Sequence, residues 1–496
     1  MKKLILSASA LLICGLGYSQ VTDTHGTASP TSVYVSPLSG SAGLANSGES
    51  IQNGNDNRVR VRQAGALMSV QTIQSDGSGS GGNLADVRQT GNVAPPPSGF
   101  ANDANVYQTG TANQSRTRQE GDFNQAITNQ GQNDDGSARN RARIQQGTNG
   151  QAEGNYAAID QDGNDNQANT LQTYDNNDAW TQQLGDDNKS LVSQDGGPNQ
   201  TDGHSASVDQ EGDNNGSIVM QSGAGARNTA VAVQLGDDNF AKQVQSTDAV
   251  AGGLGNLATV SQGDGSVNSN LVPTILFGQL DNVDDITNVG FSGDSFGGIA
   301  YQTQGGSDNE SEIHQFGASG VDGNYAEQNQ SGDSNDAMIV QNAFGNPSGG
   351  ANYARQDQDD NASNSQAGIA QNGFNHKAYQ RQTGDDNNIM STQRGNGNLV
   401  NTYQDGDQNR GTTAQRGVDN QILLVQRGGH SYSVTQNLPN GSPVGSPNGG
   451  NQADILQLGP NGDFSADAIE CVFEDQMSMP MPELGTFSLG DVCPGC

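Results

Sequence analysis

The chain has 496 residues, of which only 31% are hydrophobic and 15% are charged, and it contains 69 glycines. So little apolar material excludes an ordinary globular protein of this length. The formal net charge of −33 excludes nucleic-acid backbones and anionic membranes as natural partners, and no run after the N-terminus is apolar enough for membrane insertion.

The first segment, residues 1–20, is predicted to be a secretory signal peptide. Met1-Lys2-Lys3 supplies a basic start, and a short apolar run over residues 4–17 follows, too short to span a bilayer. Cleavage is expected after Gln20. Cys14 is compatible with a lipoprotein signal, but Ile13 fits the position before it poorly. Residues 21–50 are rich in Ser, Thr, Gly, Ala and Pro, which indicates a disordered leader.

A repeated unit then fills the chain from about Gln52 to Gln457. Its pattern is Q-x-G-x-x-N-x-A-x-x-x, eleven residues closed by the Gln of the next unit, and it recurs roughly thirty times. Residues 161–172 are a well-formed copy. A fixed internal period of this length predicts a stack of similar structural units.

The unit divides into a constant segment and a variable one. Six residues separate the Asn from the next Gln even where the remainder lengthens, as from Asn188 to Gln194. This predicts a strand beside a loop, and it argues against the disorder that composition alone would allow. Because strand side chains alternate, the Asn, the second and fourth residues after it, and the Gln share one face. The second and fourth residues are small or apolar, so this face is predicted to point inward; Gln243 is an exception.

The Gly and the Asp/Asn-rich run after each Gln are predicted to reverse the chain, since these residues tolerate positive φ. One strand and one reversal per unit gives two units per turn. The sequence therefore predicts an all-β fold, a two-sheet parallel β-solenoid over residues 51–463. The predicted turn glycines include Gly121, Gly163, Gly185, Gly212, Gly236 and Gly384.

The inward Asn and Gln would each cost about 1–3 kcal/mol if buried without a partner. Stacking at the strand spacing of about 4.8 Å lets identical amides hydrogen-bond to the copies above and below. A primary amide both donates and accepts, which explains the choice of residue. The predicted ladder and assembly residues are Gln119, Asn124, Gln161, Asn166, Gln172, Asn188, Gln194, Gln210, Asn215, Gln221, Gln234, Asn239, Gln382 and Asn387.

The variable loops carry insertions and acidic pairs. Long loops follow Gln89, Gln146, Gln194, Gln221, Gln245, Gln315, Gln341 and Gln436, each closing an even-numbered unit if the region around Gln279 counts as one unit; those after Gln74, Gln130 and Gln358 are exceptions. The insertions are thus expected mainly along one edge. Asp pairs at 186–187, 237–238, 359–360 and 385–386 are expected in reversals, as solubilising residues or as a site where salt or Ca²⁺ promotes stacking.

Two stretches depart from the period. Residues 271–298 match the repeat least well and contain a run, residues 271–277, that is more apolar than any normal unit; the stretch is interpreted as a repacked turn or bulge, with a hinge or partner site as the alternative. Residues 464–496 form a C-terminal tail, which is expected to cap the last turn or to attach to another component. It holds Cys471, Cys493 and Cys496, which predict one disulfide and one remaining thiol in an exported protein; the final CxxC is weak evidence for a metal or redox site.

Motifs of catalysis are not found in this sequence. It has no GxSxG, HExxH or P-loop, and residues 160–166 resemble a calcium loop but lack the terminal Glu. His204, His376 and His430 fall at or beside the Asn position and are interpreted as substitutions in the ladder. We therefore expect no enzymatic activity and no cofactor.

The unit in residues 161–172, with its many copies, resembles the curlin repeat of curli fibre subunits, the secreted amyloid of bacterial biofilms. The resemblance covers nearly the whole of the chain after residue 51. The present chain is longer, with more repeats, long insertions and a Cys-bearing tail.

This resemblance implies an extracellular, cell-surface fibre subunit for adhesion and biofilm matrix. It also implies export through an outer-membrane pore, to which residues 21–50 would address the chain, and assembly by nucleated addition. The alternative is a monomeric solenoid adhesin or ligand-binding rod that uses its insertion-bearing edge. Outward strand positions vary widely, unlike the regular Thr rows of ice binders, which favours the fibre.

Overall fold

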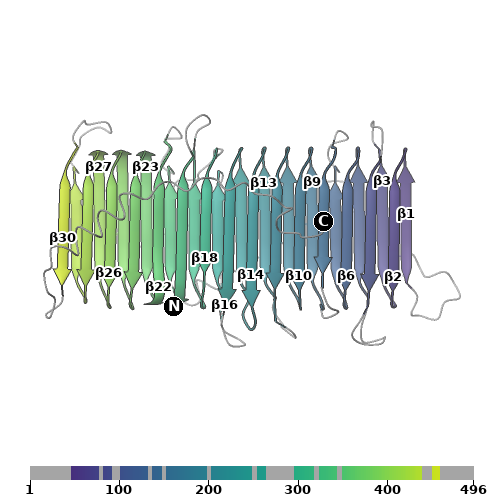
Figure 1. Cartoon of the computed structure of the whole chain (residues 1–496), viewed down its shortest axis with the longest axis horizontal. Helices are drawn as coiled ribbons and strands as arrows, with labels where there is room; N and C mark the ends of the chain where they lie inside the picture. The colour runs from purple at the N-terminus through teal and green to yellow at the C-terminus, as the bar shows by residue number, and fades with distance from the viewer. Residues whose placement is uncertain are drawn as a thin grey trace, which may run out of the picture.

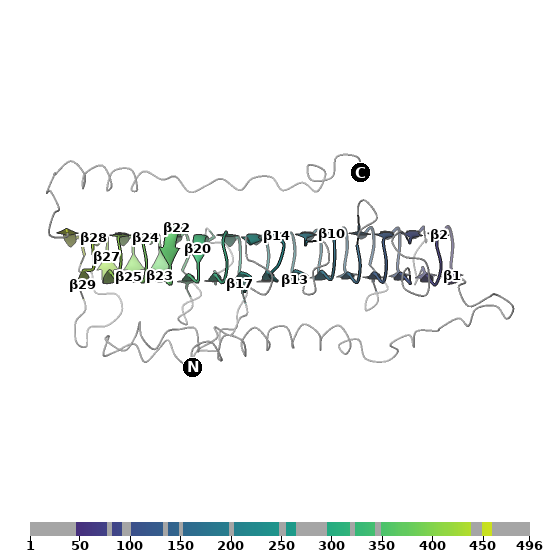
Figure 2. The same ribbon diagram turned by 90° about the horizontal axis from the view of Figure 1, so that it is seen from below.

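The computed structural model describes residues 46–76, 82–91, 101–131, 137–147, 152–197, 203–247, 254–263, 295–317, 323–342, 349–437 and 449–458. Within these residues every regular element is a β-strand, and the strands form two flat sheets that face each other (Figures 1 and 2). None of the described residues forms a helix long and apolar enough to cross a membrane.

The odd-numbered strands form one sheet of 15 strands, in chain order. They are β1 (Ser47–Asn53), β3 (Ser69–Ser75), β5 (Asp103–Thr109), β7 (Gln125–Gln130), β9 (Tyr156–Asp162), β11 (Asp178–Leu184), β13 (Ser205–Glu211), β15 (Thr229–Leu235), β17 (Leu257–Gln262), β19 (Glu310–Gln315), β21 (Asp336–Gln341), β23 (Gln366–Phe374), β25 (Asn388–Asn396), β27 (Arg410–Val418) and β29 (Ser431–Gln436).

The even-numbered strands form the second sheet, also of 15 strands. They are β2 (Arg58–Ala64), β4 (Leu84–Thr90), β6 (Gln114–Glu120), β8 (Arg141–Gln146), β10 (Gln167–Thr173), β12 (Lys189–Asp195), β14 (Gly216–Gly223), β16 (Phe240–Thr247), β18 (Ile299–Gln304), β20 (Tyr325–Asp333), β22 (Tyr353–Ser363), β24 (Lys377–Thr383), β26 (Leu399–Asp405), β28 (Gln421–Arg427) and β30 (Gln452–Leu458).

Strand pairing follows the repeat. All neighbours are parallel, and equivalent positions of the unit lie side by side, as where Ala168 of β10 pairs with Ser190 of β12 and Gln172 pairs with Gln194. Because the chain alternates between the sheets, each turn of the solenoid uses two units. The predicted two-sheet parallel β-solenoid is confirmed.

The core is a thin layer between the sheets. Ile159 and Val192 are fully buried at the fourth position after the Asn, as is Val208 at the fourth position after His204, and small residues such as Ala168 fill the second position. Burying one Val or Ile stabilises the fold by about 1.5–3 kcal/mol. The alternation predicted from the sequence therefore places the small and apolar side chains inside.

The reversals use left-handed backbone at two positions of the unit. Gly163 has φ of 106°, and Asp165, two residues later, has φ of 57°. Asp187, Asp238 and Asp386 are also left-handed. Asp186–Asp187 and Asp237–Asp238 lie in reversals as predicted, but residues 359–360 lie inside strand β22, so that part of the prediction is wrong.

The expected distribution of the insertions is wrong beyond β17. The sequence count treated the region around Gln279 as one unit, yet β16 pairs directly with β18, and β17 with β19. The unit count therefore shifts by one. Gln315, Gln341 and Gln436 close β19, β21 and β29, which are odd-numbered, so their loops leave from the other edge. The insertions decorate both edges of the solenoid.

Several sequence predictions lie outside the described residues. These are the signal peptide, the segment 21–45, almost all of residues 271–298, and the tail with Cys471, Cys493 and Cys496. They stay predictions. Residues 47–50, predicted as part of the disordered leader, instead lie in strand β1, so that part of the prediction is wrong.

Candidate functional site

A continuous glutamine ladder runs along each sheet. In the odd-numbered sheet, Nε2 of Gln161 donates to Oε1 of Gln183 at 2.7 Å, and Gln183 donates to Gln210 at 2.8 Å. All three side chains are fully buried. Each amide accepts from the preceding turn and donates to the following one, so the ladder has a direction.

Both ladders extend through every described strand, with donor–acceptor distances of 2.7–3.0 Å. The odd ladder contains Gln52, Gln74, Gln108, Gln130, Gln161, Gln183, Gln210, Gln234, Gln262, Gln315, Gln341, Gln371, Gln393, Gln415 and Gln436. The even ladder contains Gln63, Gln89, Gln119, Gln146, Gln172, Gln194, Gln221, Gln245, Gln304, Gln330, Gln358, Gln382, Gln404, Gln426 and Gln457.

In the ladder glutamines after Gln52, the second hydrogen of the side-chain amide bonds across the core to the other sheet. Gln172 of β10 donates to the carbonyl oxygen of Tyr156 in β9 at 2.8 Å, and Gln194 of β12 donates to that of Asp178 in β11 at 2.8 Å. Both Nε2 hydrogens are therefore used, one along the stack and one across the core. This explains how so polar a core is stable.

The asparagines make different hydrogen bonds from the side-chain ladder that was predicted for them. The backbone N–H of Asn188 donates to Oδ1 of Asn166 at 2.9 Å, and that of Asn215 donates to Oδ1 of Asn188 at 2.9 Å. Nδ2 of Asn166 donates to the carbonyl oxygen of Gly185 at 2.6 Å. Asn239 repeats this pattern. The amide fits the reversal because it mimics a backbone group, and side-chain pairs such as Asn124 Nδ2 to Asn102 Oδ1 are only additional.

At some turns His or Ser replaces Asn and supplies the same acceptor. Nδ1 of His376 accepts the backbone N–H of Asn398 at 3.3 Å, and Nδ1 of His204 accepts that of Asn228 at 3.2 Å. Oγ of Ser365 accepts the N–H of Asn387 at 3.2 Å. The two imidazoles are fully buried within this pattern, so they lie in the ladder as interpreted from the sequence.

Acid is expected to weaken the solenoid through His376. Burial lowers the pKa of this imidazole to about 4, below its ordinary 6.5. Between pH 6.5 and 4, His376 is therefore protonated in the unfolded chain but neutral in the folded chain. The free energy of unfolding consequently falls as the pH drops from 6.5 to 4. A shift of this size corresponds to about 3 kcal/mol in unfolding free energy. Denaturation of wild type and His376→Asn across this pH range measures the difference; parallel pH profiles would contradict the prediction.

The predicted turn glycines hold positions that exclude a side chain. A Cβ on Gly163 would lie 2.1 Å from the carbonyl oxygen of Gly185 in the next turn, and one on Gly185 would lie 2.3 Å from that of Gly212. Gly384 is similar at 2.7 Å from the oxygen of Gly406, and Gly121 lies 2.0 Å from that of Ala152. Gly236 also has positive φ, 98°. These glycines permit close stacking of the reversals as well as the turn itself.

Adjacent glycines allow a matched test of this role. A Cβ on Gly306 would lie 2.1 Å from the oxygen of Gly332 at φ of 82°, whereas one on Gly305 would meet its nearest atom at 4.0 Å. Alanine in a left-handed backbone conformation costs roughly 1–3 kcal/mol, so we expect Gly306→Ala to lower the unfolding free energy by at least this amount. Gly305→Ala should change the unfolding free energy little. Equal midpoints of chemical denaturation for the two variants would refute this role.

Sequence reasoning missed a second internal ladder. Gln243 is the first of five glutamines at the fourth position of successive even strands, and its Nε2 donates to Oε1 of Gln302 at 3.0 Å. The series continues through Gln328 and Gln356 to Gln380 at 2.9–3.1 Å. Comparing alternate units, rather than consecutive ones, would have revealed it.

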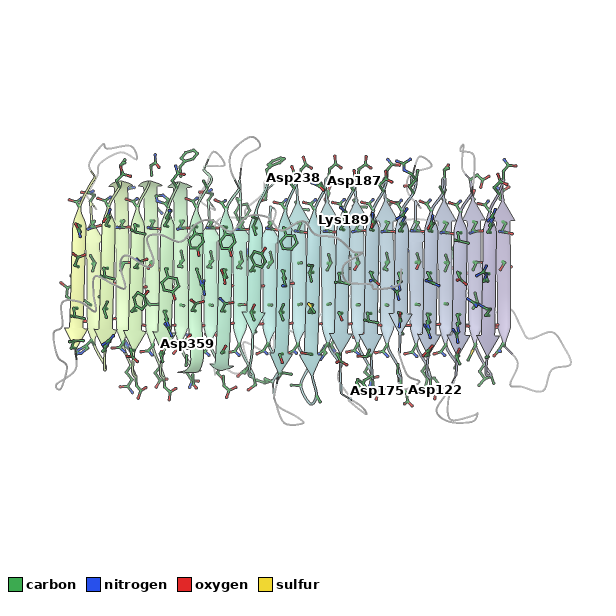
Figure 3. The ribbon with its side chains drawn as sticks, viewed as in Figure 1. Asp122, Asp175, Asp187, Lys189, Asp238 and Asp359 are labelled. Atoms are coloured by element: carbon green, nitrogen blue, oxygen red, sulfur yellow. The ribbon has the colours of Figure 1, made fainter. Side chains whose placement is uncertain are left out.

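Acidic side chains also stack along one edge. Oδ1 of Asp213 accepts the backbone N–H of Asp186 at 2.9 Å, and Oδ1 of Asp237 accepts that of Asp213 at 2.9 Å. Asp187 and Asp238 project at this edge, and Asp122, Asp175 and Asp359 at the other (Figure 3). Within the described residues no three His, Cys, Asp or Glu side chains are grouped to hold a metal ion, so the calcium hypothesis stays a prediction.

The two ends of the described solenoid carry complementary groups. At the first end, Oε1 of Gln52 and of Gln63 accept no hydrogen bond from a described residue, and β1 and β2 each have one neighbour. At the last end, the Nε2 groups of Gln436 and Gln457 reach no further glutamine. β1 and β30 lie at opposite extremities (Figure 1). The first end thus offers acceptors and the last end donors.

No protein-family model matches the chain, and no curated protein matches it.

Proposed function

We propose that this chain is a secreted, curlin-like structural subunit whose solenoids add end to end into extracellular fibres for adhesion and biofilm matrix. The observation that carries the proposal is the pair of unbroken, directional glutamine ladders that reach both ends of the described solenoid. A second copy placed on either end continues both ladders with the geometry already used inside one chain.

The strand edges support the same conclusion. Open edges of a sheet are templates for another chain, and here two edges lie together at each end. Val61, at an inward position of β2, is 36% exposed, whereas its counterpart Val87 in β4 is fully buried. Adding the last turn of a second copy would cover this apolar surface. Hydrogen bonding and burial therefore both favour end-to-end addition.

Growth by addition at the ends is tested by a seeded time course on the chain without residues 1–20. Thioflavin-T fluorescence and electron microscopy follow the product. The proposal expects a lag that preformed fibres remove, with unbranched fibres as the product. A β-rich monomer that stays soluble at high concentration would overturn it, and would favour an adhesin that works as a single rod.

A further inference from the structure

The outer faces of the two sheets carry opposite charge. We call the outer surface of the even-numbered strands the even face and that of the odd-numbered strands the odd face, each formed by the first, third and fifth residues after the Asn. The even face holds thirteen of the 21 Lys and Arg of the chain, namely Arg58, Arg60, Arg62, Arg88, Arg116, Arg118, Arg141, Arg143, Lys189, Lys242, Arg355, Lys377 and Arg381. Its acidic residues are four: Asp86, Glu327, Asp357 and Asp454.

The odd face shows the reverse pattern. Its acidic residues are Glu49, Asp103, Asp160, Asp178, Asp209 and Asp336, which are half-buried, and Glu310 and Glu312, which are buried. Among the described strands Arg410 is its one Lys or Arg. Burial, and then the nearby Glu312, raises the pKa of Glu310 to about 8, so this group is largely neutral at pH 7 while the others supply the negative charge.

The positive charge is densest on β2, β4, β6 and β8. Arg62, Arg88 and Arg118 occupy equivalent positions on three successive strands, at the strand spacing of about 4.8 Å. Arg58, Arg60, Arg88 and Arg141 are exposed and form no ion pair with a described residue. Like charges on neighbouring strands destabilise a sheet, so the isolated solenoid gains nothing from the charges of these four arginines. A negatively charged partner would relieve the repulsion.

We propose that the even face of one solenoid packs against the odd face of a second copy, and that this contact binds the proposed fibres side by side. The inference rests on the proposed function in one respect: the filaments that this contact would bundle are the proposed fibres. Placed in parallel and in register, the arginines of β2 to β8 lie over Glu49, Asp103 and Asp160 of the second copy.

Period and shape favour a second copy over another polyanion. Both faces are flat, and both repeat at the same strand spacing, so strands of the two faces that are aligned at one turn stay aligned at every following turn (Figure 2). The contact joins two different faces, so each pair leaves one even face and one odd face free. Layers can therefore add without limit, which gives bundles rather than pairs.

The test uses charge reversal on each face. The first variant carries Arg88→Glu, Arg116→Glu and Arg141→Glu; the second carries Glu49→Lys, Asp103→Lys and Asp160→Lys. The control for the first is Arg394→Glu, Arg416→Glu and Arg427→Glu, which makes the same change in net charge just after closing glutamines, at the edges. Electron microscopy counts filaments per bundle at low salt, and seeded growth is measured in parallel.

We expect bundles from wild type and control, single filaments from either face variant, mixed bundles when the two variants are combined, and unchanged growth on seeds. Raising the salt to 1 M, where the Debye length is about 3 Å, should disperse wild-type bundles. Bundling by the first variant would overturn the proposal. So would wild-type filaments that stay single and instead bind alginate or duplex DNA.

If the wild-type protein forms no fibres, the proposed function is wrong, but the contact between the even and odd faces can still be tested. Sedimentation velocity then measures pairing between soluble solenoids. Association that is lost in each face variant and restored by mixing them supports the contact, and a monomeric wild type at low salt refutes it.

Discussion

Replacing Gln183 by alanine is expected to lower the unfolding free energy by about 2–6 kcal/mol, because two buried amide groups lose their partner at about 1–3 kcal/mol each. These are Nε2 of Gln161 and Oε1 of Gln210, which flank Gln183 in the odd ladder. The carbonyl oxygen of Gln167 across the core loses a donor as well. The variant should also form fibres more slowly, since the same ladder continues to both ends.

Gln182 is the matched control, because it is the same residue in the same strand but points outward. Gln182→Ala should change the midpoint of chemical denaturation little. Gln183→Glu separates donation from shape: an ionised carboxylate cannot donate to Gln210, so this variant should be less stable than wild type at pH 7 and should recover as acid protonates it. Equal midpoints for the two alanine variants would contradict the ladder account.

Blocking the last end is expected to stop growth while leaving the fold intact. The backbone N–H of Gln421 donates to the carbonyl oxygen of Asn451 at 2.7 Å, so first, third and fifth residues of a strand direct their N–H toward the following turn. In β29 and β30 the N–H groups of Ser433 and Asp454 therefore point away from the neighbouring strand. Proline at an edge removes only such an outward donor.

Ser433→Pro combined with Asp454→Pro should reduce seeded growth at least tenfold. Its first end remains intact, so the variant should also add to the last end of wild-type fibres and, at substoichiometric amounts, stop growth at that end. Ser433→Ala with Asp454→Ala keeps both N–H groups and should grow normally. Circular dichroism and denaturation midpoints establish that the proline variant is folded. Growth of the folded proline variant at the wild-type rate would mean that fibres do not extend through these strands.

Much of the fold follows from the spacing within one unit. The constant distance from Asn188 to Gln194 identifies the strand, and alternation within it identifies the buried face. Two units per turn then follow from a single reversal per unit. The count failed only at residues 264–294, because periodicity cannot number the units of a stretch that lacks the period.

The role of the asparagines was less predictable. Gln and Asn carry the same amide, but the shorter Asn side chain keeps its oxygen near the backbone. Asn166 therefore accepts from a backbone N–H group, whereas Gln161 accepts from the side chain of another Gln.

The charged faces could not be predicted from composition. A net charge of −33 describes the whole chain, and the arginines of β2 to β8 separate from the acids only when alternate units are assigned to different sheets.

Mass per length of single filaments, dispersed at high salt and imaged by scanning transmission electron microscopy, tests end-to-end stacking most directly. Fifteen turns at about 4.8 Å give roughly 72 Å for a chain of 51.3 kDa, hence about 0.7 kDa per Å. That value is the predicted result. Filaments in which each chain contributes one layer of about 4.8 Å would weigh roughly 11 kDa per Å, and would contradict a fibre built from intact solenoids.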